Sequence, residues 1–353
     1  MYKILAINPG STSTKVGLYE DDKNIFVETV SHSPEDLKDF KTINDQIDYR
    51  LAIVKQILKD HNVDKLDAVV ARGGLIKPLK SGGTYEINDA MLHDLKIAIG
   101  GSHSSNLGGL IARNISDEMG IKAYTVDPTV VDELEEKARY SGCPELPRLS
   151  KYHVLNQKAI ARRYAKDRGL KYEDVNVVVC HMGGGVSVGA HRKGKCIDVN
   201  NTLDGEGPFT PERAGTLPTG DLIKLCYSGK YTFEQMYSKA VGHGGMVGYV
   251  GSNNFKQICE KANNGDPDCK LLIEAFTYDV SKYIGSMAIA LENDIDAIIL
   301  TGGIAYAKEA VEPIKHYVGH LAPVVVYPGE DELLSLTEGT LRVLRHEEEA
   351  KEY

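Results

Sequence analysis

Residues 2–30 read YKILAINPGSTSTKVGLYEDDKNIFVETV, and this stretch decides the fold. It holds three runs rich in apolar and β-branched residues, separated by two short turn sequences, which is the pattern of an antiparallel three-stranded meander. The predicted strands are 2–8, 15–20 and 24–30, and the predicted turns are 9–13 and 20–23. The chain therefore opens with the strands of a sheet.

The same meander recurs in the second half of the chain. Residues 176–181 form an apolar run, and the triplet GGG follows at 183–185. Two further strand sequences lie at 186–190 and 196–200, around the turn RKGK. A pattern of this length that occurs twice indicates two structurally similar parts.

A second repeat follows each meander. LDAVVARGG at 66–74 matches IDAIILTGG at 295–303, each with an acidic start, an apolar strand and a Gly-Gly exit. An amphipathic helix precedes each one, since apolar residues recur at helical spacing. The first helical face holds Ile47, Leu51, Val54 and Leu58, and the second holds Ile273, Phe276, Val280, Tyr283, Met287 and Leu291. Apolar strands that follow helices are typical of parallel strands covered on both faces.

These repeats predict an α/β protein with two similar domains that face each other across a nucleotide cleft, as in the actin-like (ribonuclease H-like) kinases. We expect the N-terminal domain to span 1–148 and to be joined by a C-terminal helix at 331–353. Residues 149–330 would form the C-terminal domain, with a nucleotide-binding insert. The boundary is set by a Pro-rich segment, whose prolines end a helix predicted at 132–140.

Composition and charge exclude several classes of protein. With 353 residues, 42% of them hydrophobic, the chain can bury two cores. The formal net charge of −9, without any Lys/Arg block, argues against nucleic acid as a partner. No apolar run approaches the roughly 20 residues of a membrane span, so we expect a cytoplasmic protein without a membrane partner. Six cysteines without a CxxC pair predict reduced thiols.

The turn of the first meander is suited to phosphate. NPGSTSTK at 8–15 packs small hydroxyl residues together, so that backbone N–H groups, Ser11, Ser13 and the charge of Lys15 can converge on phosphate oxygens. A strand follows this turn, whereas a P-loop leads into a helix. An ordinary polar hairpin is the alternative interpretation.

The equivalent turn of the second meander reads HMGGGVS at 181–187, and its three glycines allow a ligand to approach the backbone closely. Two such turns can hold the β- and γ-phosphates of a nucleotide. We expect the Gly-Gly exit at 302–303 and the glycine-rich stretch 242–251 to form the wall around the nucleoside. Each of these segments, taken alone, is also compatible with a flexible loop.

Six motifs in register over most of the chain resemble the acetokinase family. They are INPGSTSTK, ARGG, VDP, CHMGGG, FTPERAGTLPTGD and TGGI, in this order. The resemblance implies an actin-like fold of two domains, Mg-ATP as cofactor, and reversible phosphoryl transfer between ATP and the carboxylate of a short-chain fatty acid. It also implies a homodimer or a higher homo-oligomer.

The resemblance implies roles for individual residues. The residues that match catalytic positions are Arg72, Asp127 and His153, and those expected near Mg²⁺ are Asn8 and Glu332. The residues expected to bind ATP are Ser11, Ser13, Lys15, His181, Gly183, Gly184, Gly185, Gly302, Gly303, Ile304 and Tyr306. Arg72 would also bind the carboxylate of the acid. His103 and Asn106, in a glycine-rich loop, are further substrate-binding candidates.

One segment departs from the family pattern. Acetate kinases carry an arginine shortly before the Gly-Asp pair that here is Gly220-Asp221, but this chain has Leu217 and Pro218 around that place. We expect Arg213, a few residues upstream, to act as the further catalytic residue and to supply the missing positive charge.

The chemistry of the reaction accounts for these residue types. A short fatty acid has a pKa near that of a Glu side chain, about 4.3, so it is already an anion at pH 7 and needs no general base. Asp127 is then better interpreted as an organiser of Mg²⁺ or water. The acid and the γ-phosphate of ATP are both anions, so cations such as Arg72 must offset the repulsion between them. Each methylene of the acid is worth only about 1–3 kcal/mol of discrimination, so propionate, butyrate, isobutyrate and valerate stay open.

Two other functions are compatible with the predicted fold. An ATP-dependent phosphatase would need a carboxylate placed to activate water, and an actin-like nucleotide switch would need a polymerisation surface or a peptide-binding domain. Without the family resemblance, His153 is as well explained as a structural histidine, and Arg72 as the cap of a strand end. The positive charge of Arg72 favours a small anionic acceptor.

Overall fold

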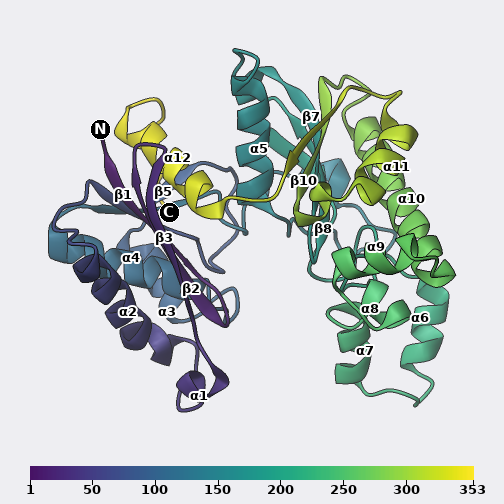
Figure 1. The fold of residues 1–353 in the computed structure, drawn as a ribbon, viewed down its shortest axis with the longest axis horizontal. Coiled ribbons are helices and arrows are strands. Elements are labelled where there is room, and N and C mark those ends of the chain that lie inside the picture. The colour runs from purple at the N-terminus through teal and green to yellow at the C-terminus, as the bar shows by residue number, and fades with distance from the viewer. The chain divides into compact units, whose positions relative to one another are not determined.

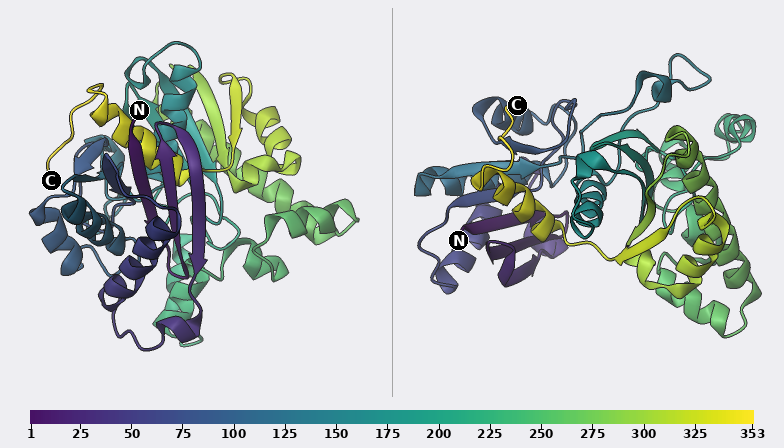
Figure 2. Two further views of the ribbon diagram at one scale, coloured as in Figure 1. Left: turned by 60° about the vertical axis from the view of Figure 1, so that its left-hand side comes forward. Right: turned by 90° about the horizontal axis from the view of Figure 1, so that it is seen from above.

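The computed structural model describes residues 1–353, and its contacts divide the chain into two compact units. Unit 1 comprises Met1–Val131 and Asp331–Tyr353, and unit 2 comprises Asp132–Glu330. Residues 132–148, which the sequence assigned to the N-terminal domain, fall within unit 2. Each unit contains one sheet with helices packed on it (Figures 1 and 2).

The sheet of unit 1 starts with the predicted meander and continues with parallel strands. β1, β2 and β3 are antiparallel neighbours, while β4 and β6 run parallel to β1. The order is β3-β2-β1-β4-β6-β5, with the short β5 antiparallel to β6 at the edge. The bounds are β1 Lys3–Pro9, β2 Ser13–Glu20, β3 Lys23–Ser31, β4 Ala68–Ala71, β5 Thr84–Glu86 and β6 Lys122–Val126.

The sheet of unit 2 repeats this order. Its meander β7-β8-β9 is again antiparallel, and β10 and β11 run parallel to β7, so the sheet reads β11-β10-β7-β8-β9. The bounds are β7 Asn176–Met182, β8 Val186–Arg192, β9 Lys195–Val199, β10 Ala297–Gly302 and β11 Val324–Pro328. The predicted fold class, with two similar α/β domains, is confirmed by this duplicated strand order.

Helices cover both faces of the unit 1 sheet. α4 and α12 both pack on β1, β4 and β6, from opposite sides (Figure 1). On α2, the predicted residues Val54 and Leu58 are buried, but Arg50 is buried as well. The bounds are α1 Pro34–Leu37, α2 Ile47–Asp60, α3 Asp89–Lys96, α4 Asn106–Met119 and α12 Glu332–Leu344, with a 3-10 turn at Asn44–Gln46.

The unit 2 sheet separates two cores. Side chains alternate along β7, so Val177 and Val179 pack with α5, whereas Val178 and Cys180 pack with the helices of the other face. Phe276 of α10, fully buried, belongs to that second core. The bounds are α5 Val154–Lys166, α6 Thr219–Cys226, α7 Phe233–Ala240, α8 Gly245–Val250, α9 Phe255–Asn263, α10 Pro267–Ala290 and α11 Lys308–Val318.

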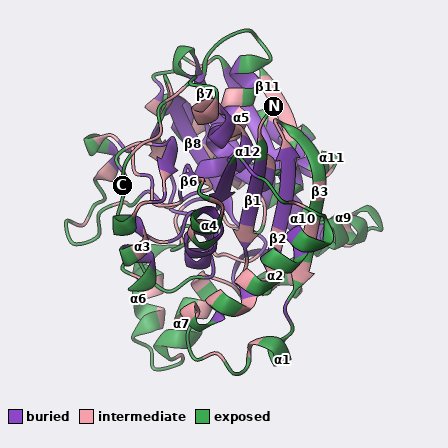
Figure 3. Cartoon of the chain, turned by 90° about the vertical axis from the view of Figure 1, so that its left-hand side faces the viewer, coloured by how far each residue is buried: buried purple, intermediate pink, exposed green.

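The helices α6 and α7 contain no buried residue. Figure 3 shows both as largely exposed, in contrast to the buried strands. Among all the helices of the chain, none combines the length and the apolar content that a membrane span requires.

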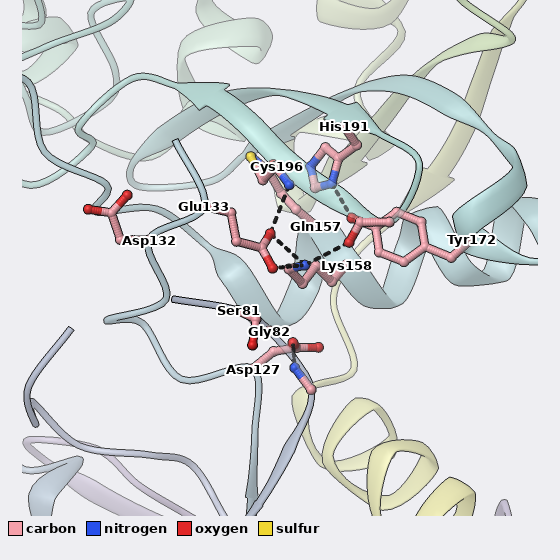
Figure 4. Close-up of polar contacts among 12 residues, drawn as sticks. Ser81, Gly82, Asp127, Asp132, Glu133, Gln157, Lys158, Tyr172, His191 and Cys196 are labelled. Carbon is pink, nitrogen blue, oxygen red and sulfur yellow. Dashed lines mark hydrogen bonds and ion pairs between the residues drawn. The ribbon is translucent and has the colours of Figure 1, made fainter. Parts of the chain in front are cut away.

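The helix predicted at 132–140 was wrong. Only Glu136–Arg139 is helical, as a single 3-10 turn. Glu133 is drawn away by tertiary contacts: its buried carboxylate pairs with Lys158 Nζ at 2.8 Å and accepts from Cys196 N at 2.8 Å (Figure 4). A buried ion pair of this kind outweighs the helical propensity of the segment.

Gly339 allows α12 to approach the sheet closely. A Cβ at this position would lie 3.1 Å from Val126 Cβ and closer still to the Val126 methyl groups. Since the core is already close-packed, we expect Gly339→Ala to lower the free energy of unfolding by about 1–3 kcal/mol, measured by urea denaturation. Gly285→Ala in α10 is the matched control, because a Cβ there has no neighbour within 4 Å. It should be stabilising by about 0.5–1 kcal/mol, and equal losses in both variants would contradict the packing argument.

Candidate active site

The predicted site residues fall into two groups, one in each unit. Unit 1 contains Asn8, Ser11, Ser13, Lys15, Arg72, His103, Asn106, Asp127 and Glu332. Unit 2 contains His153, His181, Gly183, Gly184, Gly185, Arg213, Gly302, Gly303, Ile304 and Tyr306.

Three residues of the first group lie at the carboxyl ends of neighbouring parallel strands. Asn8 is near the end of β1, Arg72 directly follows β4, and Asp127 directly follows β6. The register places the ends of β1 and β4, and those of β4 and β6, side by side. Ligands of α/β sheets bind at this edge.

Glu332 connects two of these residues. It is the first residue of α12, which is capped by Asp331. One of its carboxylate oxygens pairs with Arg72, and the other accepts a hydrogen bond from Asn8 Nδ2. The side chains of Arg72 and Glu332 are 30% and 22% exposed, so a dissolved ligand can reach the pair.

Asp127 adopts a strained backbone conformation. Its φ of +42° is unusual for a residue with a side chain, and the residue is buried. Gly83 N donates to Asp127 Oδ1 at 2.7 Å, and Asp127 N donates to Gly83 O at 3.0 Å. Figure 4 shows Asp127 next to Ser81 and Gly82, and Lys351 Nζ donates to Ser81 Oγ at 2.9 Å. The C-terminal tail therefore supports the loop that holds this carboxylate.

Asn106 fixes the loop that follows Arg72. Its Oδ1 accepts from Leu75 N at 2.8 Å, and its Nδ2 donates to Gly101 O at 2.9 Å. Gly74 approaches so closely that a Cβ there would lie 2.6 Å from Asn106 Cα. Both ends of the amide are thus engaged within the chain.

His103 is exposed and has a defined tautomer. Ser105 N donates to His103 Nδ1 at 3.2 Å, so the neutral ring carries its proton on Nε2. Neighbouring atoms that partly desolvate the ring, and then the charge of Arg72, lower the pKa of His103. At pH 7 this side chain is therefore a neutral hydrogen-bond donor.

The turn at residues 10–14 presents free donors. Ser11 and Thr12 are not buried, and their backbone N–H groups donate to no other part of the chain. Ser13 and Lys15 lie two positions apart in β2, so their side chains point to the same face of the strand. Backbone N–H groups, hydroxyls and one ammonium group are the donors that a phosphate-binding turn requires.

In unit 2, two predicted residues form a stacked pair. The rings of His153 and His181 have centroids 3.9 Å apart and planes inclined by 18°. His181 Nδ1 lies 2.7 Å from Asn156 Oδ1, and because an amide oxygen only accepts, this nitrogen carries a proton. His181 belongs to β7, and His153 is the N-cap residue of α5.

A chain of buried hydrogen bonds orients His153. Ser187 Oγ accepts from Gln157 Nε2 at 2.7 Å, so its own proton is available for His153 Nδ1, 2.9 Å away. Ser187 Oγ thus holds the Nδ1 side of the His153 ring in place. Gln157 Oε1 lies 2.8 Å from His191 Nε2, and His191 Nδ1 lies 2.6 Å from Tyr172 OH. Figure 4 shows Gln157, His191 and Tyr172 of this chain.

The glycine turn of unit 2 lies against Arg213. Any side chain at Gly185 would overlap the Arg213 guanidinium and would lie 3.6 Å from His153 Cε1. Thr210 Oγ1 donates to Gly184 O at 2.7 Å, which ties the Arg213 loop to the same turn. Desolvation lowers the pKa of Arg213 from its ordinary value, but an arginine stays charged at neutral pH. The structure thus brings a cation and a histidine to the turn.

A cavity of about 690 Å³ opens beside this turn, a size typical of ligand sites. Gly302 ends β10 with φ of +85°, where a side chain would collide with the backbone of Met182. The predicted ATP-binding residues in the cavity wall are Gly183, Gly184, Gly303, Ile304 and Tyr306. The other wall residues are Pro211, Asn253, Phe255, Lys256, Cys259, Glu260, Asn263, Ala307 and Glu309.

Residues 242–251, which the sequence analysis expects in the nucleoside wall, do not line this cavity. These residues form α8 and the bend before it, and none of them lines the cavity. The wall comes instead from α9, including Lys256, Glu260 and Asn263. No sequence signal distinguishes a polar helix face that lines a cavity from one that faces solvent, so these residues were missed.

Comparison with protein families gives a match to the acetokinase family over residues 148–340. The probable butyrate kinase of Clostridium botulinum (strain Eklund 17B / Type B) is 56% identical over 354 residues, which span 100% of this chain and 99% of that protein. Butyrate kinase 1 of Clostridium acetobutylicum (strain ATCC 824) is 55% identical over 355 residues, which span 100% of both chains.

Solved structures share the fold. Acetate kinase of Porphyromonas gingivalis has a TM-score of 0.80 at 20% identity, with 98% of this chain and 100% of that chain covered. A propionate kinase from Francisella tularensis subsp. tularensis SCHU S4 has a TM-score of 0.75 at 20% identity, with 96% and 99% covered. These matches agree with the predicted actin-like fold of two domains.

Replacing Arg72 should raise the pKa of His103. The charge of Arg72 disfavours a second positive charge on the ring, and Arg72→Met removes it. We expect the His103 titration, followed by NMR, to move upward toward the usual value of about 6.5. The control is Arg113→Met, because Arg113 pairs with Asp117 at 2.6 Å instead. A pKa of His103 that stays depressed in Arg72→Met would mean that desolvation alone causes the shift.

Ser187→Ala should loosen His153. The substitution removes the hydrogen-bond partner of His153 Nδ1 and one acceptor of Gln157 Nε2. We expect a loss of stability of about 1–3 kcal/mol and, by ¹⁵N NMR, a change in the balance between the two ring tautomers of His153. Ser281→Ala removes a similarly buried hydroxyl, bonded at 2.6 Å to Thr277 O in α10. This control should lose stability without any change in the His153 tautomer.

Proposed function

The chain belongs to the acetokinase family, and from this premise we propose that it catalyses the reversible reaction of butanoate with ATP to give butanoyl phosphate and ADP. It is a kinase whose acceptor is a carboxylate. The names of its relatives favour this activity over the two alternatives, an ATP-dependent phosphatase and an actin-like nucleotide switch.

The observation that carries the proposal is the cavity of about 690 Å³ that leads to the glycine turn of unit 2. Its wall offers Ile304 and Tyr306 for the nucleoside of ATP, with Gly303 beside them. The phosphates would then lie at the turn, where Gly183 and Gly184 leave the backbone accessible. Gly185, Gly302 and His181 would shape the same subsite.

Arg72 would bind the carboxylate of the acid. Its guanidinium is accessible and already oriented by Glu332. The Nε2 proton of neutral His103 is a second donor, and Asn106 keeps the intervening loops in place. An arginine that is prepositioned in this way loses little entropy when it binds a carboxylate.

Each unit offers groups that suit a phosphoryl group. In unit 2 these are the ring of His153 and the positive charge of Arg213. In unit 1 they are the positive charge of Lys15 and the hydroxyl and N–H donors of the turn with Ser11 and Ser13. The acid attacks as an anion, so no proton has to be removed from it. Catalysis then consists of positioning and of charge stabilisation.

Unit 1 contains residues of the types that bind Mg²⁺. Asn8, Asp127 and Glu332 provide oxygen donors, which are the ligands that Mg²⁺ prefers. No group of three or more His, Cys, Asp or Glu side chains forms a protein-only metal site in the chain. This set therefore suits an ion that arrives with the phosphates of ATP and keeps several waters. When bound, Mg²⁺ would neutralise charge on the phosphate oxygens.

Three further properties belong to the proposal. We expect butanoate to be preferred over propionate, isobutyrate and valerate, because the relatives are named for it. We place the enzyme in the cytoplasm, which agrees with six free cysteines. We expect a homodimer or a higher homo-oligomer, and neither nucleic acid nor membrane as a partner.

Trapping of acyl phosphate with hydroxylamine tests the proposal directly. The protein is mixed with ATP, Mg²⁺ and each acid from acetate to valerate, and we expect the hydroxamate yield to peak at butanoate. Arg72→Ala should raise the KM for butanoate about 10- to 100-fold, since a charge-assisted hydrogen bond worth about 1.5–3 kcal/mol is lost.

Arg113→Ala is the control for this experiment, because Arg113 pairs with Asp117 at 2.6 Å outside the candidate site. Its KM for butanoate should stay within about twofold of the unmodified protein. ATP hydrolysis at a rate indifferent to every acid would refute the kinase and support the phosphatase instead.

A further inference from the structure

Arg50 is a fully buried arginine in contact with the phosphate turn of unit 1. It lies on α2 and is 0% exposed. Its Nη1 donates to Gly10 O at 2.7 Å and to Ser13 O at 3.0 Å. The same nitrogen donates to Thr14 Oγ1 at 3.1 Å, and Nη2 donates to Ser11 O at 3.2 Å. One side chain therefore holds three of the five backbone carbonyls of residues 10–14.

No carboxylate neutralises this guanidinium. Its remaining partner is Gln46, whose Oε1 accepts from Nε at 3.1 Å and from Nη2 at 2.9 Å. Every acceptor of Arg50 is thus a neutral oxygen. Desolvation lowers the pKa of Arg50, but an arginine remains protonated at neutral pH. A buried charge without a counter-charge is costly, so its presence calls for a reason.

Thr14 extends the cluster to His32 without adding charge. The Thr14 hydroxyl accepts from Arg50, and its oxygen lies 2.8 Å from His32 Nε2. The other ring nitrogen, Nδ1, lies 3.3 Å from Tyr49 OH. Desolvation, and then the charge of Arg50, lower the pKa of His32, so its ring is neutral at pH 7. The side chains bonded to one another here therefore carry one net positive charge.

The other polar groups of this turn are free to bind an anion. The carbonyls of Gly10, Ser11 and Ser13 are engaged by Arg50, while the N–H groups of Ser11 and Thr12 donate to nothing within the chain. Successive free N–H groups in a turn form a site for an anion. The free N–H donors and the carbonyls that the Arg50 charge holds thus lie in the same turn, residues 10–14.

We propose that Arg50 is the positioning residue of this turn and the buried counter-charge of the phosphate that binds there. It fixes the carbonyls so that the N–H groups stay available, and its charge is balanced when the anion arrives. The identity of the anion rests on the proposed function: it is the phosphoryl group that ATP and butanoyl phosphate share. No motif pointed to Arg50, because it lies on the buried face of α2.

The variant Gln46→Glu tests the effect of the Arg50 charge on anion binding separately from its effect on the structure of the turn. The new carboxylate would accept the same two bonds from Arg50 and would cancel its charge, while the turn keeps its shape. We expect the Kd for Mg-ATP, measured by calorimetry, and the KM for butanoyl phosphate in the ADP direction to rise at least about tenfold. The melting temperature should stay the same or rise. The KM for butanoate, which is bound through Arg72, should change less than twofold.

Variants of Arg50 itself form the second arm. Arg50→Gln should raise the same two constants more than Arg50→Lys, which keeps the charge and loses part of the hydrogen bonding. Val54→Ala is the matched control, because Val54 lies one turn further along α2 and is also 0% exposed. It should lower the melting temperature and leave both constants unchanged. If the Arg50 variants do not fold, Gln46→Glu decides alone.

The outcomes are distinguishable from a failure of the proposed function. Unchanged phosphate affinity in Gln46→Glu, in a protein that forms hydroxamate normally, would overturn the inference and leave the kinase intact. Weaker binding of Mg-ATP in Gln46→Glu, in a protein that forms no acyl phosphate from any acid, would support Arg50 as the counter-charge and refute the kinase.

Discussion

The geometry of the unit 1 site depends on the contacts that the Glu332 carboxylate makes with Asn8 and Arg72. The carboxylate joins Asn8, near the end of β1, to Arg72, which follows β4, across 324 and 260 residues of sequence. Because Glu332 is the first residue of α12, this contact also sets the start of a helix that covers the middle of the sheet. Gly339 permits that helix to pack closely. The strand ends, the last helix and the proposed acid-binding arginine are therefore held as one assembly.

The two meanders place turns at equivalent positions but equip them differently. In unit 1 the turn carries hydroxyl residues and is supported by Arg50, whose charge has no counter-charge in the chain. In unit 2 the turn is made of glycines, and Thr210 and Arg213 support it. A chain with a net charge of −9 thus concentrates positive charge where phosphate is expected, which is how an acidic protein can bind anions.

Much of the fold could be predicted from the sequence because its signals are local. Turn residues and alternation identified both meanders, and helical spacing identified the buried faces around Val54 and Phe276. The prediction failed at 132–140, where Glu133 pairs with Lys158 instead of continuing a helix. Tertiary packing brings Lys158 close to Glu133, and no local sequence pattern predicts this contact.

The sequence by itself determined the duplicated α/β architecture and the residue types of the site, since periodicity and turn chemistry depend on near neighbours only. Only the tertiary structure decided which residues meet. Asn8 reaches Glu332, Arg50 reaches the carbonyls of the first turn, and α9 lines the cavity in place of 242–251. These contacts depend on strand order and helix packing across the whole chain, which a pattern within a few residues does not specify.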